Sequence, residues 1–148
     1  MKRFGTLLFL TLLATVSNAQ QESKIEGPSP INPVENAVLD NGCSDGTDPV
    51  EWTFEWTEVQ GAVRYHLWVI HSGARLPAVN QTSIKSTSYT RSDRGYIAPQ
   101  NQDDWTWRVR ALTRDGWTKW SDARHFSVEL MGTDCPGPDP GGVGDKRP

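Results

Sequence analysis

Apolar and polar residues alternate at every second position through much of the middle of the chain. The alternation is clearest between Val50 and Thr57, where large apolar residues occupy every other position: Val50, Trp52, Phe54 and Trp56. Successive side chains of a β-strand point to opposite faces of its sheet, so this run predicts a strand with one buried and one solvated face. No useful length of chain repeats its apolar residues at the period of a helix. The pattern therefore predicts an all-β domain.

The same reading predicts seven strands. The first is a proline-rich edge strand over residues 28–33 that continues at 37–40. The others are expected at 50–57, 63–70, 76–84, 86–90, 105–111 and 123–130. Short strands separated by turn residues are typical of a β-sandwich or a barrel.

Three of these strands divide their residues between a core face and an outer face. The expected core positions are Val63, Tyr65, Leu67 and Val69, then Trp105, Trp107, Val109 and Ala111, and finally Phe126, Val128 and Leu130. The expected outer positions are Arg64, His66, Trp68 and Ile70 on one strand and Thr106, Arg108 and Arg110 on another. Four of the seven tryptophans are thus core residues, because each large ring removes much apolar area from water: Trp52, Trp56, Trp105 and Trp107.

The first nineteen residues have the pattern of a secretory signal peptide. Lys2 and Arg3 precede an apolar run at 7–16, and small residues follow at Ser17 and Ala19. The run is shorter than the roughly 20 apolar residues that a membrane-spanning helix needs. We expect residues 1–19 to be removed and a secreted or periplasmic chain to remain, without membrane insertion. Its parts would be a flexible segment at 20–27, one domain at 28–131 and a Gly/Pro-rich tail at 132–148.

Charge and cysteine content narrow the class of protein further. The net charge is −3, and losing Lys2 and Arg3 with the signal peptide makes it −5, so the domain lacks the basic surface that nucleic acid or anionic lipid requires. In an oxidising compartment the two cysteines, Cys43 and Cys135, are expected to form one disulfide. Such a link would stabilise by about 4 to 5 kcal/mol on the chain-entropy model. If successive strands alternate in direction, the loop that contains Cys43 and the end of the last strand, near Cys135, lie at the same end of the sandwich. The alternative to a disulfide is that both cysteines are unpaired, buried thiols.

Two groups of residues carry a family resemblance. The series Phe54-Glu55-Trp56, Gly61-Ala62 and Tyr65-His66-Leu67 resembles the second and third strands of fibronectin type III domains. The last two strands of that family are similar to the run 105–111 followed by Gly116, Trp120-Ser121 and Phe126-Ser127-Val128. The resemblance covers about residues 28–130. It implies an all-β, seven-stranded two-sheet sandwich of immunoglobulin-like, fibronectin type III topology.

The chain departs from that family's pattern at two places. Trp105 stands where the family has a tyrosine whose hydroxyl forms a corner hydrogen bond, so the corner must be satisfied differently here. The stretch 91–104 is longer and more polar than the family's usual turn. An exposed loop of this composition is a place where a binding function can lie.

The element Trp117-Thr118-Lys119-Trp120-Ser121 resembles the Trp-Ser-x-Trp-Ser element of cytokine receptor domains. In that family, strand arginines intercalate between the tryptophans. The resemblance implies a structural ladder formed by Arg108, Arg110, Trp117 and Trp120. A guanidinium over an indole face gains about 0.5 to 2 kcal/mol, and its planarity permits stacking that lysine cannot reproduce. The implied likeness concerns architecture and not receptor signalling.

The outer face also offers a ligand platform, in which His66 and Trp68 would act together with the two tryptophans of the ladder. Sugar rings present apolar C–H faces that stack on exposed indoles. Indoles already engaged with arginines are not available for this role. The sequence therefore leaves a structural ladder and a glycan-binding surface as alternatives.

Motifs for catalysis or metal binding are missing from the sequence. No nucleophile elbow, phosphate loop or zinc-protease motif occurs, so we expect no catalytic residues and no cofactor. His66 and His71 are five positions apart on one strand and face opposite sides, which prevents shared metal ligation. A hydrated acidic loop explains Asp103 and Asp104 better than a calcium site does. The sequon Asn80-Gln81-Thr82 matters only where the host glycosylates exported proteins.

These observations favour a non-catalytic interaction module that presents either the 91–104 loop or the outer face around Trp68 to a protein. The first alternative is a carbohydrate-binding module that uses exposed tryptophans. The second is a small secreted inhibitor of a hydrolase. The expected partner is an extracellular protein or a glycan, and nucleic acid is excluded.

Overall fold

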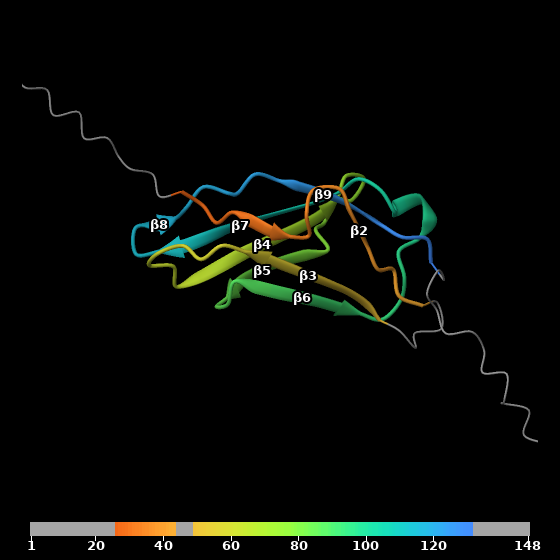
Figure 1. Cartoon of the computed structure of the whole chain (residues 1–148), viewed down its shortest axis with the longest axis horizontal. Coiled ribbons are helices and arrows are strands. Elements are labelled where there is room, and N and C mark those ends of the chain that lie inside the picture. Colours follow the sequence, from red (N-terminus) through yellow and green to blue (C-terminus); the bar gives the residue numbers. More distant parts are fainter. Residues whose placement is uncertain (1–25, 44–48, 132–148) are drawn as a thin grey trace, which may run out of the picture.

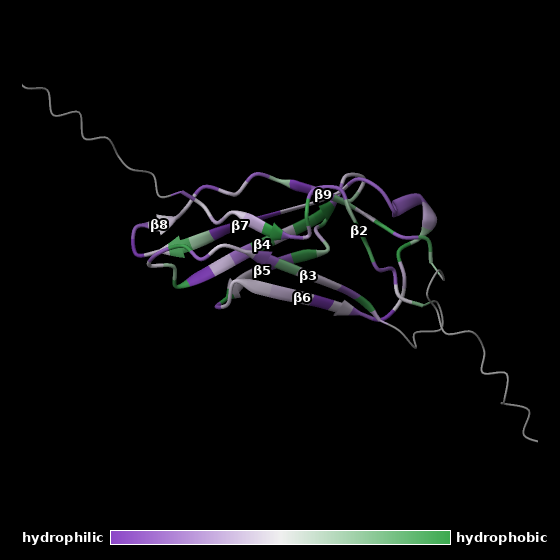
Figure 2. Ribbon diagram, viewed as in Figure 1, coloured by the Kyte–Doolittle hydropathy of each residue, from purple (hydrophilic) through white to green (hydrophobic). Residues whose placement is uncertain are grey.

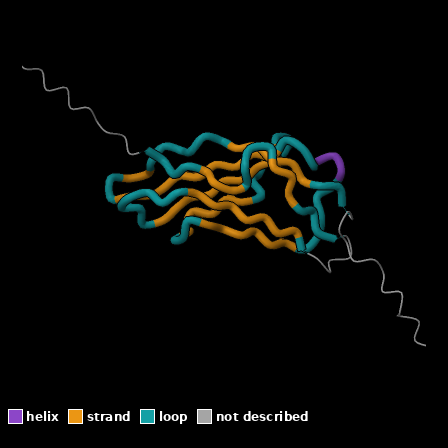
Figure 3. The backbone as a smooth tube through the Cα atoms, in the orientation of Figure 1, coloured by secondary structure: helices purple, strands orange, loops and turns teal. Residues whose placement is uncertain are grey.

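The computed structural model describes residues 26–43 and 49–131. Within these residues the chain forms strands joined by loops, with a single short 3-10 helix, η1 (Pro99–Asn101) (Figure 3). The strands are β1 (Pro30–Asn32), β2 (Ala37–Leu39), β3 (Val50–Trp56), β4 (Arg64–His71), β5 (Val79–Ile84), β6 (Ser88–Asp93), β7 (Trp105–Thr113), β8 (Gly116–Trp117) and β9 (Arg124–Val128). The expected signal peptide, the tail at 132–148 and Cys135 lie outside the described residues. No helix in the described ranges has the length and apolarity needed to cross a membrane.

The strands form two facing sheets (Figure 1). The smaller sheet has the order β1-β3-β6, and the larger has the order β2-β9-β7-β4-β5, with β8 pairing with β7 beside this path. The predicted all-β, two-sheet sandwich is confirmed. The long strands β3, β4 and β7 contribute the inward residues of both layers.

The first predicted strand is divided between the two sheets. β1 pairs antiparallel with β3, whereas β2 pairs parallel with β9. The chain changes sheets through a turn in which Asn36 has a positive φ of 60° and donates its amide to the carbonyl of His125. Asparagine tolerates this left-handed conformation better than most residues do. The crossing explains why the sequence suggested one interrupted strand.

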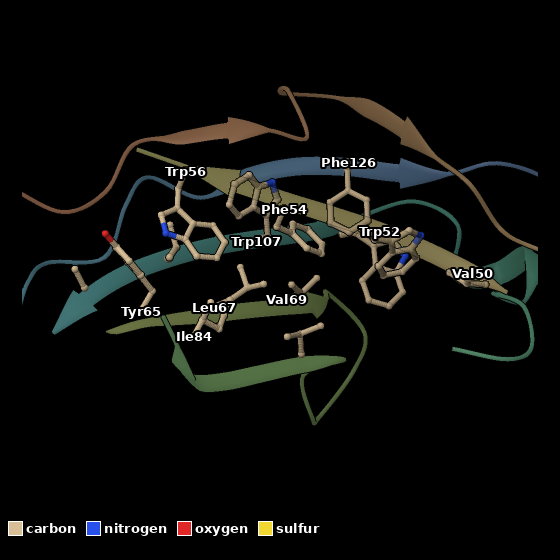
Figure 4. Packing of buried hydrophobic residues seen from close by; sticks show 14 of the residues in the cluster. Val50, Trp52, Phe54, Trp56, Tyr65, Leu67, Val69, Ile84, Trp107 and Phe126 are labelled. Carbon is tan, nitrogen blue, oxygen red and sulfur yellow. The ribbon is translucent and has the colours of Figure 1, made fainter. Parts of the chain in front are cut away.

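The core consists of aromatic and aliphatic side chains packed between the sheets (Figure 4). Trp52, Trp56 and Trp107 are fully buried, and Trp105 is nearly so, which confirms the core predicted from the alternation. The Trp52 and Trp105 rings meet edge to face with centroids 5.1 Å apart. Figure 2 shows the contrast in hydropathy between the apolar stretch of β4 and the mainly polar β6.

Three residues that the alternation placed in the core or in a strand are exposed. Val63 is 58% exposed and Leu130 is 63% exposed, so their predicted inward positions were wrong. Val63 lies just before β4, and Leu130 lies beyond the end of β9. The apolar alternation of the sequence thus continues past the strand ends, where these side chains are no longer buried. Leu76 belongs to the turn before β5 and is also exposed.

The ends of β2 and β9 lie at the same pole, because the two strands are parallel and Leu39 is opposite Val128. Asn41, fully buried just after β2, donates to the carbonyl of Glu129 at 2.9 Å. Cys43 is buried in the same region. Its expected partner, Cys135, is not among the described residues, so the disulfide stays a prediction.

Candidate binding face

The outward side chains of β4 and β7 form one face because these strands are antiparallel neighbours. His66 lies opposite Arg110, and Trp68 lies opposite Arg108. Their inward neighbours along the strands are core residues, so alternation forces these four side chains onto the outer side of the larger sheet. The sequence assigned all four correctly to this side.

A glycine turn brings the Trp-Thr-Lys-Trp-Ser element back over this face. Gly116 has a φ of +109°, a backbone conformation that side-chain-bearing residues rarely adopt, and the chain reverses there to pair with β7. Trp117 and Trp120 follow within the next few residues. From the other side Gly27 approaches the element so closely that a Cβ atom there would lie 2.6 Å from the carbonyl oxygen of Lys119. The segment is therefore enclosed between β7 and the start of the described chain.

Two hydroxyl groups anchor this element to β7. The amide of Ala111 donates to Oγ1 of Thr118 at 3.0 Å, and the amide of Thr118 donates to the carbonyl of Ala111 at 2.9 Å. Ser121 and Val109 repeat the arrangement at 2.8 and 3.0 Å. Each hydroxyl takes the place of a carbonyl from a neighbouring strand, so the element satisfies amides of β7 beyond the short strand β8, which ends at Trp117. This explains why small hydroxyl residues follow both tryptophans.

The structure brings together the four residues predicted to form a ladder. The guanidinium carbon of Arg110 lies 4.6 Å from the ring centroid of Trp117 and 4.4 Å from that of Trp120. Arg108 lies over Trp120 at 4.7 Å. Arg64 extends the series over Trp117 at 5.8 Å. We call this arrangement the ladder; its contacts run in the order Arg64, Trp117, Arg110, Trp120 and Arg108.

Arg64 was missed as a ladder residue, although a signal was present. It lies opposite Leu112, two positions beyond Arg110 on the neighbouring strand. The outward position of Arg64 follows from alternation, but its place in the series depends on the β4 to β7 register. A single sequence does not define that register.

His66 lies beneath the ladder and is only 6% exposed, although the sequence analysis placed it on a ligand face. Its ring is 4.8 Å from that of Trp120 and 5.8 Å from that of Trp117. Burial lowers its pKa below 6.5, and the charges of Arg110 and Arg108 lower it further, while a hydrogen bond to Asn80 opposes them. The tryptophans cover His66, so it supports the face and is not available to a ligand.

The accessible part of the face consists of rims and edges. Arg64 and Arg108 are exposed, whereas Arg110 and the three tryptophans, Trp68, Trp117 and Trp120, are half-buried. Trp68 meets His66 edge to face at 6.4 Å and is not stacked by an arginine among the described residues. The face therefore presents the edges of guanidiniums, the rims of Trp117 and Trp120, and Trp68, which no arginine of the described residues covers.

The predicted 91–104 loop is shorter than expected, because β6 extends to Asp93 and the Arg91 guanidinium covers Trp52 at 4.5 Å. The remaining loop is held in place. Asn41 donates to the carbonyl of Ile97 at 3.1 Å and accepts from its amide at 2.5 Å. Asn41 and Ile97 are 56 residues apart, and nothing in the sequence around either residue predicts their contact.

Trp105 resolves the expected change at the corner. Its indole Nε1 donates to the carbonyl of Asn101, four residues upstream, at 2.7 Å. The tyrosine corner of such sandwiches likewise bonds the backbone a few residues upstream. The indole N–H of Trp105 therefore makes the backbone hydrogen bond that a tyrosine hydroxyl makes in fibronectin type III domains.

A hollow of about 350 Å³ lies beside this corner, lined partly by His71, Tyr96 and Trp105. Tyr96 is 50% exposed at its edge. Asp103 and Asp104 are exposed nearby, and no three His, Cys, Asp or Glu side chains gather as metal ligands in the described part of the chain.

No protein family model matches this chain, and no curated protein matches it. Among solved structures, it is similar to a Fn3-like protein from Clostridium thermocellum at 24% identity, with a TM-score of 0.46, over 74% of this chain and 98% of the other. It is also similar to a myokine structure at 13% identity, with a TM-score of 0.45, over 69% of this chain and 97% of the other. The fibronectin type-III domain of human fibronectin type III domain containing protein 3 matches at 14% identity and a TM-score of 0.43, over 84% of this chain and 98% of the other. The strand order and the two facing sheets described above define an immunoglobulin-like sandwich of the fibronectin type III kind.

Proposed function

We propose that this chain is a secreted or periplasmic, non-catalytic interaction module that binds a protein through the outer face of its larger sheet. One observation carries the proposal: the half-exposed rims of Trp68, Trp117 and Trp120 lie together with Arg64 and Arg108 on a single face. Tryptophan and arginine are the residues most enriched at the energetic centres of protein interfaces. The sandwich supports them as a rigid frame.

Carbohydrate binding has less support, because the ring faces that a sugar would need are occupied. Arg110 lies over both Trp117 and Trp120, and Arg108 and Arg64 add contacts to these same rings. Displacing a guanidinium would forfeit about 0.5 to 2 kcal/mol per contact before any sugar could stack. Only Trp68 is left as a stacking surface, and one ring is a small platform.

The 94–104 loop is the second surface on which a partner could bind. Its support is the fixed backbone at Ile97 and the exposed ring of Tyr96. An inhibitor that inserts into an active site needs a protruding loop, whereas this loop forms a wall of the hollow beside Trp105. The loop therefore fits a receiving surface better than an inhibitory one.

Export supports the extracellular or periplasmic part of the proposal and rests on the pattern of residues 1–19. Expression of the full chain with its own N-terminus tests it. The mature protein should appear outside the cytoplasm with Gln20 as its first residue. A cytoplasmic product that retains Met1 would contradict export while leaving the binding proposal intact.

Capture of partners by the immobilised mature chain from its native extracellular fraction tests the binding proposal. A protein identified in this way is purified and titrated against the wild type, Trp68→Ala and Tyr96→Ala. We expect Trp68→Ala to weaken binding at least tenfold and Tyr96→Ala to leave it unchanged, since truncating an interface tryptophan commonly costs more than 1 kcal/mol. The reverse result would move the site to the loop. If no captured protein rebinds the purified wild type, the proposal is wrong.

A further inference from the structure

The three arginines of the ladder form a line of positive charge that runs along β7 and ends on the neighbouring strand β4. Arg108 and Arg110 are two residues apart on β7, and Arg64 lies opposite Leu112, the next outward position of that strand. Each two-residue step along a strand advances about 6.8 Å. The two intervening indoles hold the guanidiniums in this series, because Arg110 contacts both rings and each outer arginine contacts one.

This line of charge has no acidic partner among the described residues. The ion pairs found there join Arg91 to Asp93 and His125 to Glu35. Arg110 donates through Nε and Nη2 to His66, but Arg64 and Arg108 form no side-chain hydrogen bonds within residues 26–43 and 49–131. The chain as a whole carries a net charge of −3, so the ladder has the opposite sign to the protein overall.

The open edges of the guanidiniums define what can bind. Both faces of Arg110 and one face each of Arg64 and Arg108 are taken up by indoles. The N–H groups at the rim of a guanidinium suit a planar carboxylate bound by two parallel hydrogen bonds. An extended peptide places alternate side chains on one side with the same step of about 6.8 Å. Aspartate or glutamate at alternate positions of such a peptide would therefore follow the same two-residue step as the β7 positions that carry Arg108 and Arg110.

We propose that the ladder binds an extended acidic segment of a protein partner, with carboxylates at alternate positions paired to Arg64, Arg110 and Arg108. The inference rests on the proposed function and names the chemistry of its partner. A sulfated polysaccharide shares the negative charge but lacks both the planar carboxylate and the two-residue step. The peptide is thus the occupant that the geometry favours.

Fluorescence anisotropy of labelled synthetic peptides with the full mature chain tests the inference. One peptide alternates three glutamates with threonines, and a second has the same composition with the glutamates in one block. We expect the alternating peptide to bind about tenfold more tightly, a preference equivalent to about 1.4 kcal/mol. Its affinity should fall as salt is raised, since exposed charges are screened. Equal binding of the two peptides would overturn the proposal in favour of nonspecific attraction.

Variants assign the binding to the ladder. Arg64→Gln combined with Arg108→Gln should weaken the alternating peptide at least tenfold, and lysine at both positions should restore part of the loss. Arg94→Gln is the matched control for Arg64→Gln alone, because Arg94 follows β6 in the other sheet and each of these two substitutions removes one positive charge. If the double variant does not fold, Arg64→Gln alone serves, since its stacking contact is the longest. Equal weakening by Arg94→Gln would contradict the assignment.

A heparin fragment used in the same titration separates the two kinds of anionic partner. Tight heparin binding that depends on Arg64 and Arg108, with no binding of either peptide, would overturn the peptide inference. Failure of both peptides while a captured protein still depends on Trp68 would refute the acidic segment and leave the proposed function standing. Peptide binding at the ladder without any captured partner would support the inference and remove the evidence for that function.

Discussion

Arg110 directs two donors at one atom of His66: its Nε and Nη2 lie 3.3 and 3.2 Å from Nδ1 of the imidazole. An arginine has no acceptor, so Nδ1 must accept and the ring proton resides on Nε2, which donates to Oδ1 of Asn80 at 2.8 Å. The neutral imidazole thus fixes the central guanidinium of the ladder from below. A charged imidazole would oppose it.

His66 should make stability depend on pH. Burial lowers its folded pKa below 6.5, Arg110 and Arg108 lower it further, and Asn80 opposes them. As pH falls, the unfolded chain takes up this proton first, so the contribution of neutral His66 is complete above pH 6.5 and declines as pH falls toward the folded pKa.

Thermal melts between about pH 7.5 and 5.5 measure this effect. His66→Gln, which does not titrate, should show a smaller fall in Tm than the wild type. His71→Gln should retain the full fall, because His71 lies on the opposite face of β4 near Trp105. An identical pH profile for the wild type and His66→Gln would contradict the assignment.

Thr118→Val should destabilise the protein by about 1 to 3 kcal/mol, because the buried amide of Ala111 loses its acceptor. Thr118→Ser keeps the hydroxyl and loses only a methyl group, worth about 0.8 kcal/mol. Urea unfolding gives the two free energies. Hydrogen exchange adds a local measurement: the Ala111 amide should exchange faster in Thr118→Val than in Thr118→Ser, and equal rates would show that the hydroxyl is not its partner.

The contribution of the Trp105 hydrogen bond to stability can be measured by comparison with Trp107, a core tryptophan on the same strand. Trp105→Phe removes both ring volume and the donor to Asn101, whereas Trp107 has a buried Nε1 with no partner among the described residues. Trp105→Phe should therefore cost about 1 kcal/mol more than Trp107→Phe in the free energy of unfolding, the net value of a typical hydrogen bond. Chemical denaturation of both variants checks this, and a larger loss in Trp107→Phe would count against the corner.

The expected link between Cys43 and Cys135 predicts a redox effect on stability. Complete reduction should lower the Tm by several degrees if the two residues are paired. A Cys43→Ala/Cys135→Ala double variant is the control, because its melt should not respond to the reductant. A wild-type melt that is unchanged after full reduction would refute the pairing.

Alternation predicted the parts of the fold that burial determines. Trp52 and Trp107 lie inward because every second side chain of their strands must enter the core. The same rule placed Val63 and Leu130 wrongly, since the apolar period does not show where a strand begins or ends. The anchoring of Ile97 by Asn41 was also beyond reach, because that contact joins positions 56 residues apart. The resemblance of the Trp-Thr-Lys-Trp-Ser element to a known motif predicted that Arg108 and Arg110 belong to the ladder. Predicting the same of Arg64 would have required the register between β4 and β7.

The arginine side-chain Nε–H resonances in a two-dimensional nitrogen–proton NMR spectrum test most directly whether the ladder occupies both tryptophans in solution. The account predicts that the Arg110 proton is shifted upfield by the two indole rings at 4.4 and 4.6 Å. In Trp120→Leu it should move toward the position of the exposed Arg94. An Arg110 resonance that already coincides with Arg94 in the wild type would contradict the stacked ladder, and with it the binding face built on its edges.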